Sequence, residues 1–241
     1  MCGRFALALT GEAVARAMDA TLDERHAAAL RAWLGRFNIT PSQPVPVVVA
    51  DGEARRVLTI LTWGLVPFWS KDPSIGARLA NARGESLDAK PAFREAWKRR
   101  RCLVPATAFY EWQASPSGEG PKQPFAIGPE QGEAGQAEPL ALGAIWERWR
   151  GPRAGVGASA GDDEVRETFA IITVEANATM RPIHDRMPVL VPRSAWGRWL
   201  ASPSPPSDLV VPAPDVGLRT WAVSRRVNNP RHDAADCLQP A

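Results

Sequence analysis

Cysteine, histidine and tyrosine are scarce in this chain of 241 residues, which contains three, three and one of them. The cysteines Cys2, Cys102 and Cys237 lie far apart, so they form no CxxC pair, no zinc-site spacing and no even-numbered disulfide framework. We therefore expect no metal, no cofactor and a reducing, cytoplasmic location. No apolar run reaches about 18 residues and no signal segment opens the chain, so we expect neither export nor a membrane span.

The charge balance is nearly even, with 29 Lys and Arg against 26 Asp and Glu. This excess does not identify an anionic partner, so any nucleic-acid contact must come from local clusters of cations. The length and the 45% hydrophobic content suit one domain over residues 1–241. Segments around 114–139 and 151–164 are rich in Gly, Pro, Ser and Glu, and we expect flexible surface loops there.

The position of Cys2 directly after Met1 suggests a chemical role for this residue. If Met1 is trimmed, as is common before a small residue, Cys2 presents an α-amine and a thiol on adjacent carbons. Their reference pKa values are ~7.7–8.0 and ~8.5, and we expect the nearby cation Arg4 to lower the thiol value. This pair can condense with an aldehyde and close to a thiazolidine ring, or act as an N-terminal nucleophile. An ordinary buried residue is the alternative.

Two titratable residues stand out further along the chain. Glu111 lies among the aromatic residues of the segment 109–112, where burial would raise its pKa and suit it to acid–base catalysis. His184 is flanked by Asp185 and Arg186 and could move protons at neutral pH. The alternatives are a glutamate paired with an arginine and a histidine that anchors a loop.

Cations and aromatics suggest a nucleic-acid surface. Asn81 and Arg83 lie one residue apart in an irregular stretch, and an arginine suits a phosphate. Residues 94–101 contain five cations, which form either a phosphate-binding patch or a solvated helix end. Most of the ten tryptophans are expected in the core, but Trp69 adjoins a surface turn and could stack on bases.

Local patterns predict a mixed structure. Helical composition covers residues 11–34, 91–100 and 194–200. Runs typical of strands cover residues 45–50 and 56–61, as a hairpin, and 124–127, 140–149, 168–174 and 218–223.

The order of short motifs resembles a known family. They are MCGRF at 1–5, WGLVP at 63–67, NARGES at 81–86, RCLVP at 101–105, FYEW at 109–112, HDRMP at 184–188, and Val223-Ser224 with Asn228. Together they resemble the SRAP (SOS response-associated peptidase) family. The resemblance implies an α+β fold, a curved, barrel-like antiparallel sheet with peripheral helices. It also implies a protein of the DNA damage response that binds single-stranded DNA and links Cys2 to abasic sites through a thiazolidine.

The resemblance implies roles for individual residues. Cys2 is the nucleophile, Asn81 holds the cysteine end near the sugar, Glu111 transfers protons, and His184 assists at the imine and the 3′ phosphate. Phosphate contacts fall to Arg4, Arg83, Arg101 and Arg186, with help from the 94–101 patch. Trp69 is a wedge against the base stack, and Ser70 takes the place of a second aromatic. We expect a monomer without a membrane partner, associated with the nucleoid if bacterial.

Other classes remain open on sequence grounds. A glutamine amidotransferase of the N-terminal nucleophile type also begins with Cys-Gly, although this chain is short and carries no synthetase domain. A self-processing or protein-cleaving peptidase could use Cys2, Glu111 and His184. A non-enzymatic DNA-binding module leaves the terminal cysteine unexplained.

Overall fold

The computed structural model describes residues 2–115, 117–130, 138–152 and 163–241. Its α-helices are α1 (Gly11–Ala17), α2 (Ala27–Arg31), α3 (Pro91–Arg99) and α4 (Trp196–Ala201). Its strands are β1 (Phe5–Leu7), β2 (Thr21–Leu22), β3 (Arg36–Ile39), β4 (Pro44–Ala50), β5 (Arg56–Trp63), β6 (Asn81–Arg83), β7 (Arg101–Ala106), β8 (Ala108–Gln113), β9 (Gln123–Pro129), β10 (Leu140–Pro152), β11 (Asp163–Glu175), β12 (Arg186–Pro188) and β13 (Leu218–Ala222). Parts of the two predicted loop segments, residues 116, 131–137 and 153–162, lie outside the described residues.

Five strands close into a barrel. The order β11-β10-β7-β4-β5 is antiparallel throughout, and a short parallel pairing of β5 with β11 joins its ends. Trp63 lies opposite Phe169 in that closing pair, and the two rings stack with centroids 6.3 Å apart. Phe5 of β1 packs against the same indole at 5.2 Å. The α+β fold with a barrel-like sheet is therefore confirmed.

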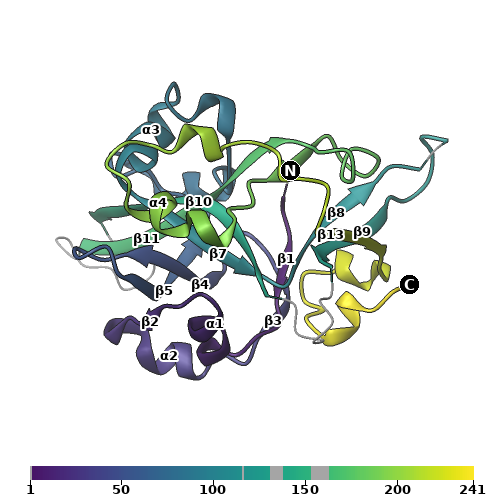
Figure 1. Ribbon diagram of the computed structural model, residues 1–241, viewed down its shortest axis with the longest axis horizontal. Coiled ribbons are helices and arrows are strands. Elements are labelled where there is room, and N and C mark those ends of the chain that lie inside the picture. Colours follow the sequence, from purple (N-terminus) through teal and green to yellow (C-terminus); the bar gives the residue numbers. More distant parts are fainter. Residues whose placement is uncertain (1, 116, 131–137, 153–162) are drawn as a thin grey trace.

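A second sheet places the N-terminal strand at its interior. Its order is β13-β9-β8-β1-β3, so β1 has a hydrogen-bonded neighbour on each side. In Figure 1, β1 runs between the barrel and the ribbon of β8, β9 and β13, and the C-terminal residues lie beside this sheet. Those residues are fastened by Asn38, whose Nδ2 donates to the carbonyls of Val227, Asn229 and His232. The first residues of the chain are therefore fixed within the fold.

Most predicted elements are present, but the single helix over residues 11–34 is wrong. The chain leaves α1 through Asp19 at φ 48°, and β2 then pairs in parallel with β5. Asp23 starts a new 3-10 turn by accepting from the amide of Arg25, and α2 follows. The pairing with β5 outweighs the helical composition of this segment, because propensity is a weak preference that tertiary contacts override.

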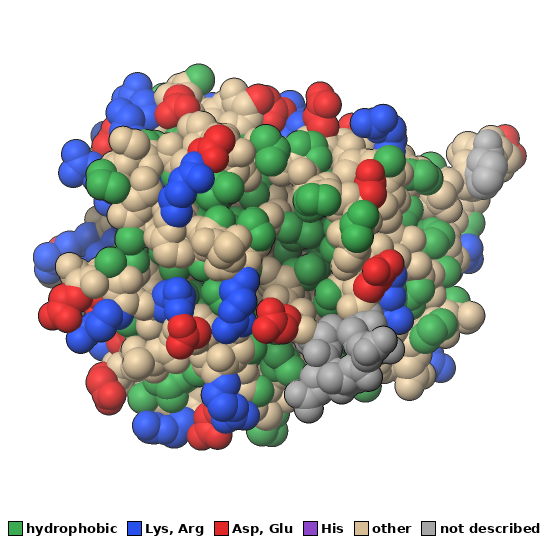
Figure 2. All heavy atoms as spheres, in the orientation of Figure 1, with side chains coloured by type: hydrophobic (Ala, Val, Ile, Leu, Met, Phe, Trp, Pro, Cys, Tyr) green, Lys and Arg blue, Asp and Glu red, His purple; other side chains and the backbone are tan. Residues whose placement is uncertain are grey.

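The surface of the described residues is mixed in charge. Figure 2 shows basic and acidic side chains interspersed over one face, with hydrophobic side chains gathered near its centre.

The longest described helix, α3, has nine residues, and none of the described helices has the length and apolar character that a bilayer crossing requires. Five of the ten tryptophans are fully or nearly buried, and four more are partly buried and pack against the hydrophobic clusters, which agrees with the expectation that most are core residues: Trp63, Trp97, Trp149, Trp196 and Trp199, and then Trp33, Trp112, Trp146 and Trp221.

Arg101 corrects the predicted DNA-binding set. Its side chain is buried, at 3% exposure, at the junction of α3 and α4. The guanidinium donates to the carbonyls of Trp97 and Lys98 at 2.9 Å each, to that of Trp199 at 2.6 Å, and to that of Ser202. Because these carbonyls lie at the C-terminal ends of two helices, where backbone acceptors run out of intrahelical donors, the buried Arg101 has a structural role and the predicted phosphate contact is wrong.

Replacing Arg101 with alanine should lower the free energy of unfolding by about 3–5 kcal/mol, because buried helix-end carbonyls lose a charged donor. The neighbouring Arg99 is the matched control, since its side chain is 74% exposed and its partner Glu95 lies 3.8 Å away. Arg99→Ala should change the free energy by less than about 0.5 kcal/mol. Urea unfolding measures both, and equal small effects would contradict the structural assignment.

Candidate functional site

The N-terminal residues lie beside the strand that carries Glu111. The amide of Tyr110 donates to the carbonyl of Arg4 at 2.9 Å, which extends the pairing of β1 and β8 toward the N-terminus. Continuing this antiparallel register brings Cys2 near Glu111. The two groups interact, because the Glu111 carboxylate contributes to the pKa of the Cys2 thiol.

Asn81 fixes the main chain at Cys2. It begins β6, which runs parallel to β11 with Asn81 opposite Ile171. Its Nδ2 donates to the Cys2 carbonyl at 2.8 Å. Its Oδ1 is buried and has no hydrogen-bond partner among the described residues. An acceptor is therefore available next to Cys2 for a donor on a bound molecule.

Glu111 is a buried carboxylate on β8, with 3% of its surface exposed. Burial raises its pKa to about 7, and the charge of Lys122 acts in the opposite direction. The physical cause is the loss of water around the charged form. At neutral pH this group is thus divided between acid and base, which is the property that proton transfer requires.

His184 lies in the loop before β12. Its Nδ1 lies 2.9 Å from the amide nitrogen of Arg186, a donor, and 2.9 Å from Oδ1 of Asp185, an acceptor. Its Nε2 lies 3.9 Å from Oε2 of Glu111. Burial lowers the His184 pKa, which favours the neutral ring. Glu111 and His184 are thus adjacent groups, a carboxyl that titrates near pH 7 beside an imidazole that favours its neutral form.

The thiol pKa of Cys2 is not lowered overall, so the predicted effect of the Arg4 cation is wrong. Cys2 is fully buried, and burial raises the pKa of its thiol, while Arg4 lowers it only through a backbone hydrogen bond that burial outweighs. The Arg4 guanidinium instead donates to Oδ1 of Asn38 at 2.8 Å and to the carbonyl of Val227 at 2.5 Å. It also lies 5.6 Å from the ring centroid of Trp112. Arg4 therefore joins β1 to β3 and to the C-terminal residues.

The other predicted phosphate ligands differ in accessibility. Arg83 is exposed at the end of β6, two residues from Asn81. Arg186 is largely buried and forms a bidentate pair with Glu85, at 2.7 and 2.9 Å, and a bond to the Thr173 carbonyl. Both arginines line a surface cleft of about 460 Å³ that Asp185 also borders. Arg83 is thus accessible to an incoming phosphate, as is Arg181 in the same cleft, whereas Arg186 is already paired.

Two aromatic side chains project from the turn after β5. Phe68 and Trp69 are each 51% exposed. Gly64 sets this turn with φ 122°, and a side chain there would lie 2.6 Å from the Gly76 carbonyl. Ser70, predicted to stand where a second aromatic belongs, accepts the Trp149 indole N–H through its carbonyl. The second exposed aromatic side chain of this turn is therefore Phe68, which precedes Trp69, and not a residue at position 70.

The cationic patch at residues 94–101 is partly exposed. Arg94, Lys98 and Arg99 lie around Glu95 at 3.8–3.9 Å, with half or more of each side chain exposed. Arg100 pairs with the buried Glu147 at 2.7 Å. Phe68, Arg99 and Arg100 share a small surface hollow, so the exposed aromatic turn adjoins this patch.

Sequence reasoning missed two residues near the site. Lys122 interacts electrostatically with both Glu111 and His184, yet it stands as a single cation in a Gly- and Pro-rich segment that gives no signal of function. Trp112 donates through Nε1 to Oδ1 of Asn228 at 2.7 Å. The available signal was its position next to Glu111 in a strand. Neighbouring strand residues face opposite sides of the sheet, so Trp112 is expected to face the side opposite to Glu111.

A surface hollow of about 810 Å³ lies apart from these groups. Its lining includes Arg25, His26, Arg166 and Glu167. Arg25 is already paired with Glu167 at 3.3 Å and with Asp23 at 2.8 Å. The lining of this hollow is therefore occupied in part by internal ion pairs, and it includes none of Cys2, Asn81, Glu111 and His184.

Known proteins resemble this chain over nearly its whole length. The abasic site processing protein YoaM of Bacillus subtilis (strain 168) is 32% identical over 242 residues, which cover 99% of this chain and 97% of that protein. The abasic site processing protein HMCES of Pongo abelii is 32% identical over 273 residues, which cover 100% of this chain and 76% of that protein. A crystal structure of a protein from Bacteroides thetaiotaomicron shares the fold, with a TM-score of 0.82, 22% identity and complete coverage of both chains.

The family assignment follows from a match to residues 1–230, which takes in β1, the barrel and the loop that carries His184. The matching family is described as SOS response associated peptidase (SRAP). This protein belongs to the SRAP family.

Proposed function

We propose that this protein processes abasic sites in DNA by capturing the lesion covalently on Cys2. The main observation behind this proposal is that Asn81, Glu111 and His184 come from three separate segments and lie close to a cysteine next to the N-terminus. The names of the relatives supply the class of substrate, since YoaM and HMCES are both abasic site processing proteins. The ring-opened abasic sugar is an aldehyde, and an N-terminal cysteine is suited to react with it.

The proposed reaction balances with loss of one water. Removal of Met1 frees the α-amine of Cys2, whose nitrogen attacks the aldehyde carbon and forms a carbinolamine. The hydroxyl then leaves with a proton as water, and a C=N bond remains. The thiol sulfur adds to that carbon while its proton passes to the nitrogen, which closes the thiazolidine. Both new bonds come from one residue, so the chemistry needs a free amine and a free thiol.

Glu111 and His184 are the proton-transfer groups of this proposal. Protonated Glu111 gives a proton to the departing hydroxyl, and its carboxylate then takes the N–H proton of the iminium, which leaves the neutral imine. Protonated Glu111 returns that proton to the nitrogen and accepts the thiol proton as the sulfur adds, so it ends in the state in which it began. Its pKa of about 7 supports both roles. A proton on Nε2 of His184, 3.9 Å from Oε2 of Glu111, stabilises the carboxylate between these steps. Asn81 holds Cys2 through its carbonyl and offers Oδ1 to a sugar hydroxyl.

The same features favour capture over hydrolysis. A cysteine hydrolase uses a thiolate as its nucleophile, and a cation or imidazolium normally lowers the thiol pKa for that purpose. Here burial raises the pKa of Cys2, and a carboxylate is its interacting neighbour. Thiol addition to an imine needs no preformed thiolate when a neighbouring base, here Glu111, accepts the thiol proton.

The DNA strand is proposed to follow the accessible cations and aromatics. Arg83 contacts a phosphate beside the lesion, and the exposed cations of α3 contact phosphates further along. Phe68 and Trp69 stack on the bases that flank the site. Arg4 and Arg186 mainly hold neighbouring segments of the protein in place, because their guanidinium groups already bind protein oxygens. Since the lesion must be splayed out to reach Cys2, single-stranded DNA is the preferred substrate.

The direct test mixes the purified protein with single-stranded DNA that carries one abasic site. A protein–DNA band that survives denaturant supports capture, and intact DNA of the same sequence is the control. A glutaminase assay and a peptidase assay on the same preparation test the alternatives. Hydrolysis without a denaturant-stable band would replace this proposal with an N-terminal nucleophile hydrolase.

Glu111→Gln should slow adduct formation by about 10²–10⁴-fold while DNA affinity stays nearly unchanged, because the amide keeps the shape but cannot exchange a proton. The wild-type rate should change slope near pH 7, where Glu111 loses its proton, and this bend should vanish in the variant. Rapid-quench gels over pH 5–9 measure both. Glu147→Gln is the control, a second buried carboxylate on β10 whose partner is Arg100. A wild-type rate for Glu111→Gln across this range would make Glu111 structural.

A residue retained before Cys2 should abolish the stable adduct, because it keeps the thiol and removes the free amine. Cys2→Ala should leave only a hydrolysable imine, and Cys2→Ser offers a poorer nucleophile that stays protonated. Intact mass of each chain confirms its N-terminus, and denaturing gels give the adduct yield. A normal yield from the blocked chain would rule out the ring.

Binding to intact single-stranded DNA should weaken with salt, with a log–log slope of roughly −0.7 per phosphate contact. The double variant Arg83→Ala/Arg99→Ala should reduce the magnitude of that slope by about 1.4. The control is Arg55→Ala, an exposed cation of the β4–β5 turn that pairs with Asp51. Fluorescence anisotropy between low and high salt measures the slopes. An affinity independent of salt would contradict the proposed phosphate contacts.

A further inference from the structure

The C-terminal residues carry a second chemical cluster. Beyond β13 the chain forms two 3-10 turns, at Arg225–Asn228 and Ala235–Leu238, and folds back over β3. Asp233 fixes this segment by accepting from the amides of Phe37 and Asn38 and from Nε of Arg36. The segment is thereby held by several bonds to the sheet that contains β1.

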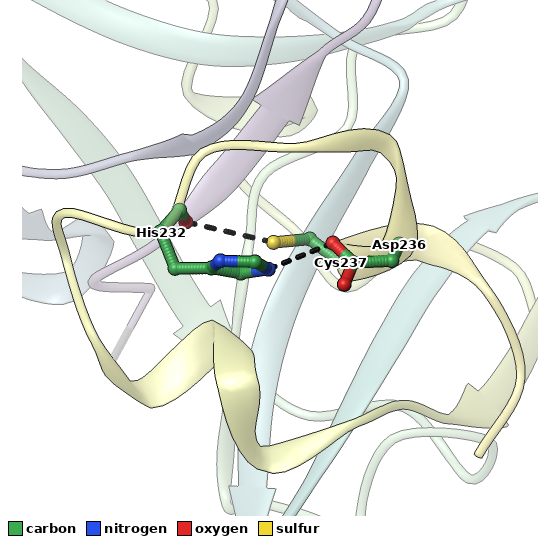
Figure 3. A group of neighbouring side chains, drawn as sticks. All are labelled: His232, Asp236 and Cys237. Carbon is green, nitrogen blue, oxygen red and sulfur yellow. Dashed lines mark hydrogen bonds and ion pairs between the residues drawn. The ribbon is translucent and has the colours of Figure 1, made fainter.

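Three different potential metal ligands converge there. Nε2 of His232 lies 2.7 Å from Oδ1 of Asp236, and the Cys237 thiol donates to the His232 carbonyl at 3.6 Å (Figure 3). The imidazole nitrogen, a carboxylate oxygen and the sulfur all lie within 4.8 Å of one another. The imidazole and the carboxylate are each 29% exposed, whereas Cys237 is buried. An ion can therefore reach the cluster from the solvent side.

We propose that His232, Asp236 and Cys237 bind a divalent transition-metal ion of the Zn²⁺ type. Thiolate, imidazole and carboxylate are the ligands that Zn²⁺ takes in proteins, at about 2.0–2.3 Å. A ligand set that includes sulfur and nitrogen disfavours Mg²⁺ and Ca²⁺, which prefer oxygen alone. Three protein ligands leave one tetrahedral position for water.

Binding replaces existing contacts in a balanced way. The ion takes the place of the proton between Nε2 of His232 and Oδ1 of Asp236, and that proton moves to Nδ1, so the ring stays neutral. The Cys237 thiol loses its proton to solvent and becomes a thiolate. The thiolate and the carboxylate then offset the two charges of the ion. Oδ2 of Asp236 stays with Nη1 of Arg226, now 3.0 Å away, so that ion pair orients the ligand.

The absence of a CxxC pair does not exclude this site, because its ligands are of three types spaced as His-x₃-Asp-Cys. The consequence of binding is mechanical, since the ion would tie His232 to the last 3-10 turn. The same segment supplies the Val227 carbonyl to Arg4. The site does not include Cys2 and stands independently of the proposed capture reaction.

Cobalt titration tests the proposal, because a thiolate bound to Co²⁺ gives a charge-transfer absorption band. The full chain carrying Cys2→Ala is the parent, since an N-terminal amine and thiol could chelate the ion themselves. We expect one equivalent of Co²⁺ to develop the band. Adding Cys237→Ser should abolish it, and Asp236→Asn or His232→Ala should weaken binding at least about tenfold. Adding Cys102→Ser is the matched control and should leave the band intact, because Cys102 is buried in β7 away from these ligands.

Thermal unfolding provides a second readout. Zn²⁺ at about 100-fold above its dissociation constant should raise the Tm of the parent by about 5–10 °C, and it should not raise the Tm of the His232→Ala variant. Circular dichroism of the metal-free variants shows whether each is folded, and Asp236→Asn keeps the side-chain size so that folding is retained. Absence of the band in the parent, or a band that survives Cys237→Ser, would overturn the proposal. So would equal affinity of the parent and Asp236→Asn.

Discussion

The pairing of β1 between β8 and β3 is the constraint on which the site depends. A strand of three residues is too short to hold a chain end by itself, but interior position in a sheet gives it hydrogen bonds on both sides. Arg4 adds bonds to Asn38 and Val227, and Asn81 adds one to the Cys2 carbonyl. An N-terminus that would ordinarily be mobile is therefore held in a defined geometry.

Burial then gives ordinary side chains their reactivity. Loss of water moves the Glu111 pKa to about 7, lowers that of His184 and raises that of the Cys2 thiol. The Glu111 shift brings a proton donor and acceptor into the neutral range, the His184 shift favours the neutral ring, and the Cys2 shift keeps the sulfur protonated. In the proposed reaction the amine therefore acts first and the thiol second. The order follows from the environment of the residues and not from their intrinsic pKa values.

Sequence alone predicted much of this arrangement, but it failed at positions whose structure is determined by contacts with residues far away in the chain. The barrel strands and α3 follow from local patterns, and the aromatic setting of Glu111 correctly indicated its burial. Arg101 looked like its exposed neighbours, because four cations in a row carry no information about which one faces inward. The break at Asp19 depends on the pairing of β2 with β5, and the partners of Arg4 come from residues more than 30 positions away. The contribution of Lys122 depends on where a patternless segment folds.

The central claim is that one carbon of the abasic sugar bonds to both the nitrogen and the sulfur of Cys2. Intact mass of the adduct before and after borohydride tests it most directly. A thiazolidine weighs the sum of protein and DNA less one water, and it does not change with borohydride. An imine has the same initial mass but gains two hydrogens on reduction, and a hemithioacetal loses no water. The account predicts the first pattern, and either of the other two would contradict it.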